Sequence, residues 1–422
     1  MSKVESKTFV PELRFPEFLN GGSWENKLLG ECLLGKPEYG INAPAVPYSH
    51  ELPTYLRITD ILENGQISQD NKVSVERDVI AKNYLDVGDI VLARTGASVG
   101  KSYKYREKDG KLVFAGFLIR IKPDERKLNS ELLFQYLFTD QYWKWVSVNS
   151  ARSGQPGING NEYSLLSIPV PTQIEEQQKV ADCLSSIDDL ITTNIKKLES
   201  LKLHKKGLMQ KLFPEEEKNV PELRFSDFEG DWKPASIAKM GMVVTGSTPS
   251  TSHREYYGGE HLFVSPADIS ENRFIETTKS TLTTEGIRKS RVVQSGSVLF
   301  VCIGSTIGKT AQVKYDCATN QQINAITAFQ GYDDDFLYYL LSFHSLTISE
   351  LAGKQAVPII NKATFSKVVL MVPEEKEQKR IADILSSIDE LIHAQADKIE
   401  TLKEYKKGLM QKLFPEIKEY IA

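Results

Sequence analysis

Residues 205–215 read KKGLMQKLFPE, and the same segment recurs without a change at residues 406–416. The likeness extends toward the N-terminus of both segments. At an offset of 201 residues, 26 of the 43 positions of 173–215 and 374–416 are identical. A period of about 200 residues is too long for a solenoid, so the sequence indicates duplication of a domain together with an arm.

Both arms carry the apolar spacing of three and four residues that is typical of a coiled-coil seam. The seam positions are Val180, Leu184, Ile187, Ile191, Leu198 and Leu201 in the first arm, and Ile381, Leu385, Ile388, Ile392, Ile399 and Leu402 in the second. Two polar pairs, Asn194/Gln395 and Lys205/Lys406, interrupt the seam in both copies, and such interruptions fix register. We predict two long helices that pair with each other. The alternative is a long helix packed on its own domain.

The rest of each half repeats with more divergence. PELRF occurs at 11–15 and at 221–225, each followed by a tryptophan, and GDIVLARTGASVGK at 88–101 is echoed by GSVLFVCIGSTIGK at 296–309. Strand-like and helix-like runs alternate in both blocks, so the predicted class is α+β with an internal repeat. The expected parts are a first globular block at 1–172, a spacer helix at 173–214, an acidic linker at 215–230, a second block at 231–373 and a C-terminal helix at 374–416.

The composition excludes several classes of protein. The 422 residues carry a net charge of −4, and the four cysteines are far apart without a C-x-x-C pair. We therefore expect no disulfide framework and no metal site, and a reducing cytoplasm as the location. Neither a secretory leader nor a membrane span is apparent. No catalytic motif is apparent either, so we expect no catalytic residues.

The two Gly-x-x-x-Gly-Lys loops are candidate phosphate contacts. A P-loop needs four residues between its glycines, and both loops have three, which argues against a P-loop ATPase. A hairpin turn is the plain alternative to a loop whose backbone and lysine touch DNA phosphates. Residues 87–126 hold nine Lys and Arg against five Asp and Glu, and residues 287–314 hold five against none. The candidates are Arg94, Ser98, Lys101 and Ser102 in the first half, and Ser305, Thr306, Lys309 and Thr310 in the second.

A second pair of polar loops offers base-reading side chains, because Arg reads guanine while Gln and Asn read adenine in the major groove. The candidates are Arg152, Gln155 and Asn159 in the first half, and Gln355, Asn361 and Lys362 in the second. An ordinary polar turn that closes the domain is the alternative. Gln321 is a further candidate from the stretch TNQQIN at 319–324, which occurs only in the second half and is either a polar strand edge or a base-reading segment. Arg94 differs from its counterpart Cys302, which favours a role in reading bases, unless it pairs with a carboxylate such as Asp89.

PELRF followed by a tryptophan, the duplicated Gly-x-x-x-Gly-Lys loop and the twin arms ending in KKGLMQKLFP resemble the specificity subunit of type I restriction-modification systems. The resemblance covers nearly the whole chain. It implies two target-recognition domains that each read one part of a bipartite, asymmetric double-stranded DNA target. It also implies that the two helices form an antiparallel coiled coil with pseudo-twofold symmetry, set the spacing of the half-sites and dock two methyltransferase subunits.

The same resemblance implies that chemistry belongs to partner chains. S-adenosylmethionine, ATP and Mg are then expected on the modification subunits and on the restriction and translocase subunits, and no cofactor on this chain. The competing hypothesis is a two-domain coiled-coil scaffold that binds protein ligands.

Overall fold

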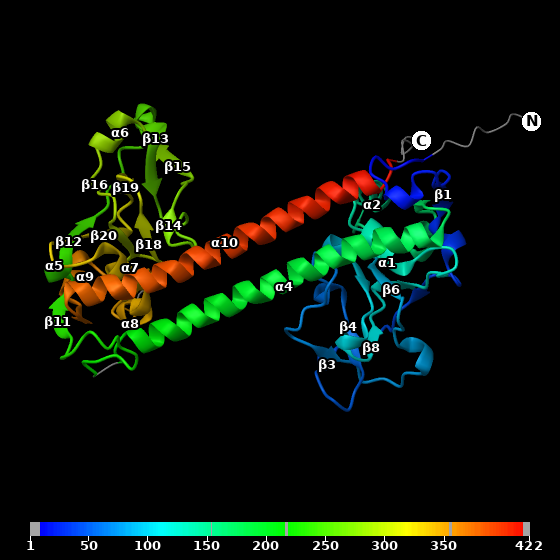
Figure 1. Cartoon of the computed structure of the whole chain (residues 1–422), viewed down its shortest axis with the longest axis horizontal. Coiled ribbons are helices and arrows are strands. Elements are labelled where there is room, and N and C mark those ends of the chain that lie inside the picture. The colour runs from blue at the N-terminus through cyan, green and yellow to red at the C-terminus, as the bar shows by residue number, and fades with distance from the viewer. Residues whose placement is uncertain (1–8, 153, 216–217, 354–356, 417–422) are drawn as a thin grey trace, which may run out of the picture. The chain divides into compact units, whose positions relative to one another are not determined.

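The computed structural model describes residues 9–152, 154–215, 218–353 and 357–416. The chain forms two compact units. The first comprises residues 1–194 and 398–422, and the second comprises residues 195–397. Each unit therefore takes one part of each long helix, α4 (Ile174–Leu212) and α10 (Glu375–Leu413), which are green and orange-red in Figure 1.

In its described residues the first unit contains two four-stranded sheets and three short α-helices. One sheet is antiparallel and has the order β2 (Glu38–Tyr39), β9 (Leu118–Ile121), β6 (Ile90–Ala93) and β7 (Ser102–Lys104). The other has the order β3 (Val46–Pro47), β5 (Val73–Ser74), β4 (Thr54–Leu56) and β8 (Leu112–Phe114). The helices are α1 (Ser130–Tyr136), α2 (Asp140–Asn149) and α3 (Gly160–Ser164), and a separate ribbon joins β1 (Glu25–Leu28) to β10 (Ser167–Val170). All four residues of β6 are buried, as expected of an uninterrupted apolar run.

The second unit repeats this plan with longer strands. Its five-stranded sheet has the order β12 (Gly241–Thr245), β20 (Ile323–Ala328), β17 (Val298–Val301), β18 (Thr310–Val313) and β14 (Phe274–Ile275). A four-stranded sheet has the order β15 (Ser280–Leu282), β13 (Tyr257–Val264), β19 (Cys317–Thr319) and β16 (Val292–Val293), and β11 (Lys233–Ser236) pairs with β21 (Val369–Val372). The helices are α5 (Ile237–Met240), α6 (Thr284–Arg288), α7 (Asp334–Phe343), α8 (Ser345–Ser349) and α9 (Lys362–Lys367). The predicted α+β repeat is confirmed.

Within each unit the two long helices run antiparallel and meet at a lysine–aspartate pair. In the first unit Lys406 Nζ lies 2.7 Å from Asp188 Oδ1. In the second, Lys205 Nζ lies 2.6 Å from Asp389 Oδ1. Lys205 and Lys406 are the polar residues that interrupt the seam, so a partner aspartate on the facing helix satisfies each of them. The predicted antiparallel pairing is confirmed.

The seam residues are buried to different degrees. Those near the start of each helix are buried, namely Val180, Leu184, Ile187, Ile381, Leu385 and Ile388, together with Ile399. Ile191, Leu198, Leu201, Ile392 and Leu402 are half-buried. Val180 and Leu184 belong to the same core as Trp24 and Leu133 of the globular block. The start of each arm thus packs on its own domain as well as on the other helix.

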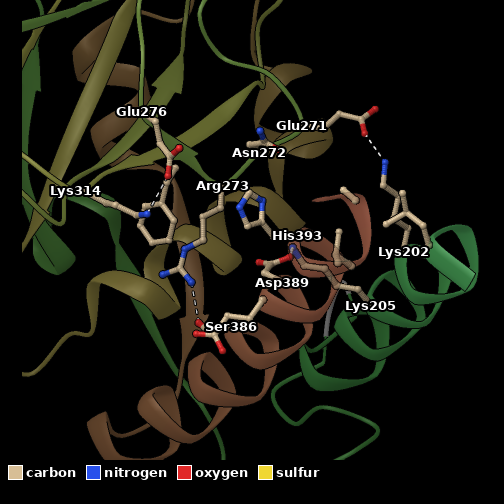
Figure 2. Close-up of a pocket in the computed structure, with 15 residues that line it drawn as sticks. Lys202, Lys205, Glu271, Asn272, Arg273, Glu276, Lys314, Ser386, Asp389 and His393 are labelled. Carbon is tan, nitrogen blue, oxygen red and sulfur yellow. Dashed lines mark hydrogen bonds and ion pairs between the residues drawn. The ribbon is translucent and has the colours of Figure 1, made fainter. Parts of the chain in front are cut away.

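In the second unit this helix pair joins the globular block around a cavity of about 550 Å³. Arg273 projects from the block and donates through Nη1 to Ser386 Oγ on α10 at 2.7 Å. Across the cavity, Lys202 on α4 pairs with Glu271 at 2.8 Å (Figure 2). The cations labelled in Figure 2 have partners within the second unit. The cavity therefore marks the place where the block meets both helices.

The repeated PELRF–Trp motif anchors the first turn of each long helix. Arg14 donates through Nε and Nη2 to the two carboxylate oxygens of Glu176, each at 2.7 Å, and Trp24 Nε1 donates to Glu176 Oε1 at 3.0 Å. The Leu13 N–H donates to the Lys412 carbonyl at 3.0 Å, so the motif also holds the end of α10. Phe414 packs edge-on against Trp24.

The second unit repeats this anchor around Glu377. Arg224 Nε and Nη2 donate to Glu377 at 2.9 and 2.8 Å, and Trp232 Nε1 donates to the same carboxylate at 3.3 Å. The Leu223 N–H donates to the Lys211 carbonyl at 2.8 Å. The segment 215–230, predicted as a linker, therefore contains a structural anchor. Each PELRF copy, whose role the sequence left open, thus holds the start of one long helix and the end of the other.

Candidate nucleic-acid interface

The two Gly-x-x-x-Gly-Lys loops are the turns of antiparallel hairpins. β6 pairs with β7 and β17 pairs with β18 on either side of them. The glycines of the loops have positive φ angles: +71° and +88° at Gly96 and Gly100, and +99° and +94° at Gly304 and Gly308. Other residues rarely adopt this conformation, which explains the paired glycines. A P-loop leads from a strand into a helix, whereas these loops lead into a second strand, so the predicted hairpin turns are confirmed and the loops do not have P-loop geometry. The contact of the loops with DNA phosphates stays a prediction.

Each hairpin turn is hydrogen-bonded to the second polar loop of its unit. In the first unit the Gly96 N–H donates to the Pro156 carbonyl at 3.0 Å, and the Ile158 N–H donates to the Arg94 carbonyl at 2.9 Å. The structure therefore brings the two candidate segments of the first half together on one surface.

The second unit has the same arrangement. The Gly304 N–H donates to the Pro358 carbonyl at 3.0 Å, and the Ile360 N–H donates to the Cys302 carbonyl at 2.8 Å. We call the two surfaces the first and second hairpin surfaces. The first is formed by residues 94–101 and 152–159 and the second by residues 302–309 and 357–362, as far as these residues are described.

On the first hairpin surface most candidate side chains already have partners. Lys101 Nζ lies 2.7 Å from Glu63 Oε1, and Arg152 pairs with Glu162. Ser98 closes a short 3₁₀ turn at Gly96–Ser98 and is half-buried. Ser102 does not belong to this surface, because its side chain is buried inside β7 with only 3% exposed.

The two amide side chains of this loop, Gln155 and Asn159, have different surroundings. Gln155 is exposed and lies close to Gly96, where a Cβ atom would come within 2.9 Å of its Nε2. Asn159 is the N-cap of α3, and its Oδ1 accepts from the Glu162 N–H at 3.0 Å. Its oxygen therefore caps the start of a helix, a role that Asn and Asp commonly take.

On the second hairpin surface Lys309 Nζ donates to the Ile269 carbonyl at 2.9 Å, and Thr310 shares a hydrogen bond with Ser342. Asn361 caps α9 through the Thr364 N–H at 2.9 Å, as Asn159 caps α3. Ser305 and Lys362 are exposed and Thr306 is half-buried. Gln321 lies nearby, where its Oε1 accepts from Thr248 Oγ1 at 2.7 Å. Gln355 lies outside the described residues.

Arg94 does not pair with Asp89. Asp89 is buried beside Arg120, with 3.3 Å between Oδ2 and Nη1. The guanidinium carbon of Arg94 instead lies 5.0 Å from the centre of the Tyr39 ring, which is a cation–π arrangement. The counterpart Cys302 is buried and accepts from Asn324 Nδ2 at 3.1 Å. Burial raises the pKa of the Cys302 thiol to about 12, so it stays neutral and offers neither a charge nor a nucleophile.

Three side chains at these surfaces carried no signal in the sequence. Tyr39 and Phe117 lie beside Arg94, and Thr248 lies beside Gln321. Sheet pairing brings them there from distant parts of the chain, so local motifs could not reveal them.

The described residues contain no group of three or more His, Cys, Asp or Glu side chains placed to hold a metal ion. Among these residues, no helix combines the length and the apolar character needed to span a bilayer.

The chain matches the family model described as the type I restriction modification DNA specificity domain twice, over residues 53–203 and 229–404. A type I restriction enzyme MjaVIII specificity subunit from Methanocaldococcus jannaschii is 24% identical over 430 residues, which cover 97% of this chain and 95% of the relative. The HindI specificity subunit from Haemophilus influenzae is 25% identical over 380 residues, with 72% of this chain and 82% of the relative covered.

Solved structures share the fold. The S subunit of a type I restriction-modification system from M. genitalium superposes with a TM-score of 0.62 at 14% identity, covering 97% of this chain and all of that one. A chain from a study of assembly and conformational transition in a type I system gives a TM-score of 0.56 at 17% identity, with 93% and 97% covered. The two model matches together span well over half of the sequence. The chain therefore belongs to the family of type I restriction modification DNA specificity domains and contains two copies of that domain.

Proposed function

We propose that this chain is the specificity subunit of a type I restriction-modification complex, and that each hairpin surface reads one part of a bipartite, asymmetric DNA target. The observation that carries the proposal is that two units of one family present the same backbone arrangement with different side chains. A common frame suits the common phosphate backbone of DNA, while different side chains suit two different half-sites. Membership of a DNA specificity family favours this function over that of a protein-binding scaffold.

The catalytic steps belong, in this proposal, to partner chains. Two methyltransferase subunits bind S-adenosylmethionine, and restriction and translocase subunits bind ATP and Mg. The paired long helices are the docking surface for the methyltransferases and the spacer between the half-sites. The purified chain is expected neither to methylate nor to cut DNA, and to co-purify with two methyltransferase subunits. Methyl transfer from S-adenosylmethionine by the isolated chain would overturn the proposal.

Replacing residues 22–172 with the corresponding block of a relative is expected to change one half of the target and leave the other half intact. The physical reason is that the first hairpin surface is built within this block, whereas the second lies wholly in the other unit. Sequencing of methylated sites in cells that carry the exchanged subunit measures the result. A change in both halves together would contradict the assignment of one reader to each unit.

Lys101→Ala is expected to weaken binding to every DNA sequence and to lower the dependence of log K on log salt by about one unit. The partner of Lys101, Glu63, is highly exposed, and an exposed ion pair holds its lysine weakly, so a phosphate can replace the carboxylate. Titration of specific and scrambled duplexes at several salt concentrations measures the effect. Glu63→Gln is the matched control and should leave the salt dependence intact. The same loss of stability in both variants, with an unchanged salt dependence, would assign Lys101 to the fold alone.

A further inference from the structure

We infer that Tyr39, Arg94 and Phe117 together form the base-reading surface of the first unit, with the first half-site of the DNA duplex as their ligand. In this assignment Arg94 reads a guanine, and the two aromatic rings make apolar contact with a neighbouring base pair, preferably at a thymine methyl group. The inference rests on the proposed function and adds to it two residues outside the loops that the sequence singled out.

The two units share a backbone frame around these positions. The Arg94 N–H donates to the Phe117 carbonyl at 3.1 Å, and the Cys302 N–H donates to the Gln322 carbonyl at 2.8 Å. Phe117 and Gln322 therefore occupy equivalent places, each next to the residue that leads into the hairpin turn.

The neighbouring strand is equivalent as well. β2 pairs with β9 in the first unit as β12 pairs with β20 in the second. The residues that follow Tyr39 and Thr245 are Gly40 and Gly246, and a Cβ atom on either glycine would come within 2.2 Å of a carbonyl oxygen. Such a close approach admits only glycine. Tyr39 and Thr245 thus stand at matching places, one residue before the same tight contact.

On this shared frame the side chains differ in chemistry. In the first unit Phe117 is 57% exposed and Tyr39 is 49% exposed. In the second unit Thr245 Oγ1 donates to Asn324 Oδ1 at 2.6 Å and Cys302 is buried, while Gln321 is exposed. The first unit therefore presents a cation against the Tyr39 ring with the exposed Phe117 on the adjoining backbone, and the second presents the carboxamide of Gln321.

The first surface is held ready for binding. The Gly160 N–H donates to the Tyr39 hydroxyl at 3.0 Å, which fixes the ring against the start of α3. The ring in turn supports the Arg94 guanidinium at 5.0 Å. A guanidinium that is already ordered loses less conformational freedom on binding, and a planar donor pair matches the O6 and N7 atoms of guanine.

Two exposed aromatic side chains beside an arginine favour DNA as the occupant over a second protein. Residues 87–126, which include the whole hairpin and Phe117, carry an excess of positive charge in an otherwise acidic chain. Phenylalanine and thymine methyl groups make the apolar contacts of direct readout. In the second unit the carboxamide of Gln321 matches the N6 and N7 atoms of adenine, so we expect that unit to prefer an adenine.

The test uses the subunit assembled with its methyltransferases and a library of duplexes that vary in both half-sites. Arg94→Ala is expected to weaken binding to the specific target about 5- to 150-fold and to relax one position of the first half-site. Phe117→Ala and Tyr39→Leu are each expected to weaken it at least about fivefold at an adjoining position. Binding to scrambled duplexes and the preference for the second half-site should stay as in the wild type.

Three variants serve as controls. Val87→Ala removes an exposed apolar side chain that lies three residues before β6 and should change no preference. Gln321→Ala should relax only the second half-site. Phe117→Leu keeps an apolar contact and should retain most of the preference. Thermal melting of Phe117→Ala, Phe117→Leu and Tyr39→Leu shows whether a loss of binding comes from poor folding instead.

Unchanged preferences in folded Phe117→Ala and Tyr39→Leu complexes would overturn the inference while leaving the proposed function intact. Lower recovery of methyltransferase subunits with an intact DNA preference would also overturn it, and would assign the aromatic groups to a protein contact. Failure of the wild-type complex to prefer any duplex would instead refute the proposed function itself.

Discussion

Replacing Glu176 with alanine is expected to lower the free energy of unfolding by about 3–5 kcal/mol. The Glu176 side chain is 1% exposed and accepts hydrogen bonds from both Arg14 and Trp24. Its removal leaves the Arg14 side chain, which is only 6% exposed, without its counter-charge. The same change frees the start of α4 from the motif that also holds the end of α10. Chemical denaturation followed by circular dichroism measures the loss.

Glu175→Ala is the matched control for this substitution. Glu175 lies in the same first turn of α4 and is exposed, so its loss should cost well under 1 kcal/mol. Glu377→Ala should reproduce the large effect in the second unit, where Arg224 and Trp232 hold the equivalent carboxylate. A loss below 1 kcal/mol for Glu176→Ala would show that the anchor is only a surface ion pair.

Inserting seven residues after Asn194 alone is expected to destabilise the protein by on the order of 5 kcal/mol. Asp188 and Lys205 are 17 residues apart on α4, as are their partners Lys406 and Asp389 on α10. The insertion lengthens the first interval by about 10 Å and leaves the second unchanged. One lysine–aspartate pair, with the apolar contacts around it, must then be lost, although the seam of α4 itself stays in phase.

A second insertion of seven residues after Gln395 should restore the stability, because both intervals then match again. Methylated targets recovered with the doubly extended subunit should have a spacer about three base pairs longer, at about 3.4 Å of duplex per base pair. Four-residue insertions, which shift the helices by about 6 Å and put the seams out of phase, should not be rescued in this way. An unchanged spacer in an active double variant would show that the helices do not set it.

The long helices were predictable because their signal is local and repeated. The heptad seam and the Pro residues behind Leu-Phe fix type, approximate length and end of each helix, and the unchanged lysines mark where the register is set. The sequence did not reveal the partners Asp188 and Asp389, since each lysine meets its aspartate more than 180 residues away along the chain. Nor did it reveal that Glu176 and Glu377 bind the PELRF arginines.

The candidate interface was predictable in outline. The glycine pairs indicated turns, and the recurrence of a second polar loop indicated a common surface. The side chains were harder to assign, because a local structural use competes with base reading. Asn159 stands three residues before Glu162, a spacing typical of a helix N-terminal capping box, and the structure places both residues in that box. Tyr39 and Phe117 reach Arg94 only through sheet pairing, which the sequence does not specify.

The C-terminal end of α10 belongs to the core of the first unit, and the C-terminal end of α4 belongs to the core of the second. This exchange affects the order in which the two units can fold. Met410, Leu413 and Phe414 belong to the core of the first unit. The core residues of the second unit lie between Leu208 and Leu385. Domains usually fold in the order in which the ribosome synthesises them. Here the N-terminal unit leaves the ribosome first but lacks part of its core until residues 410–414 have been translated. The core of the second unit is therefore complete first, and the apolar surface around Trp24 stays uncovered until Phe414 can pack against it.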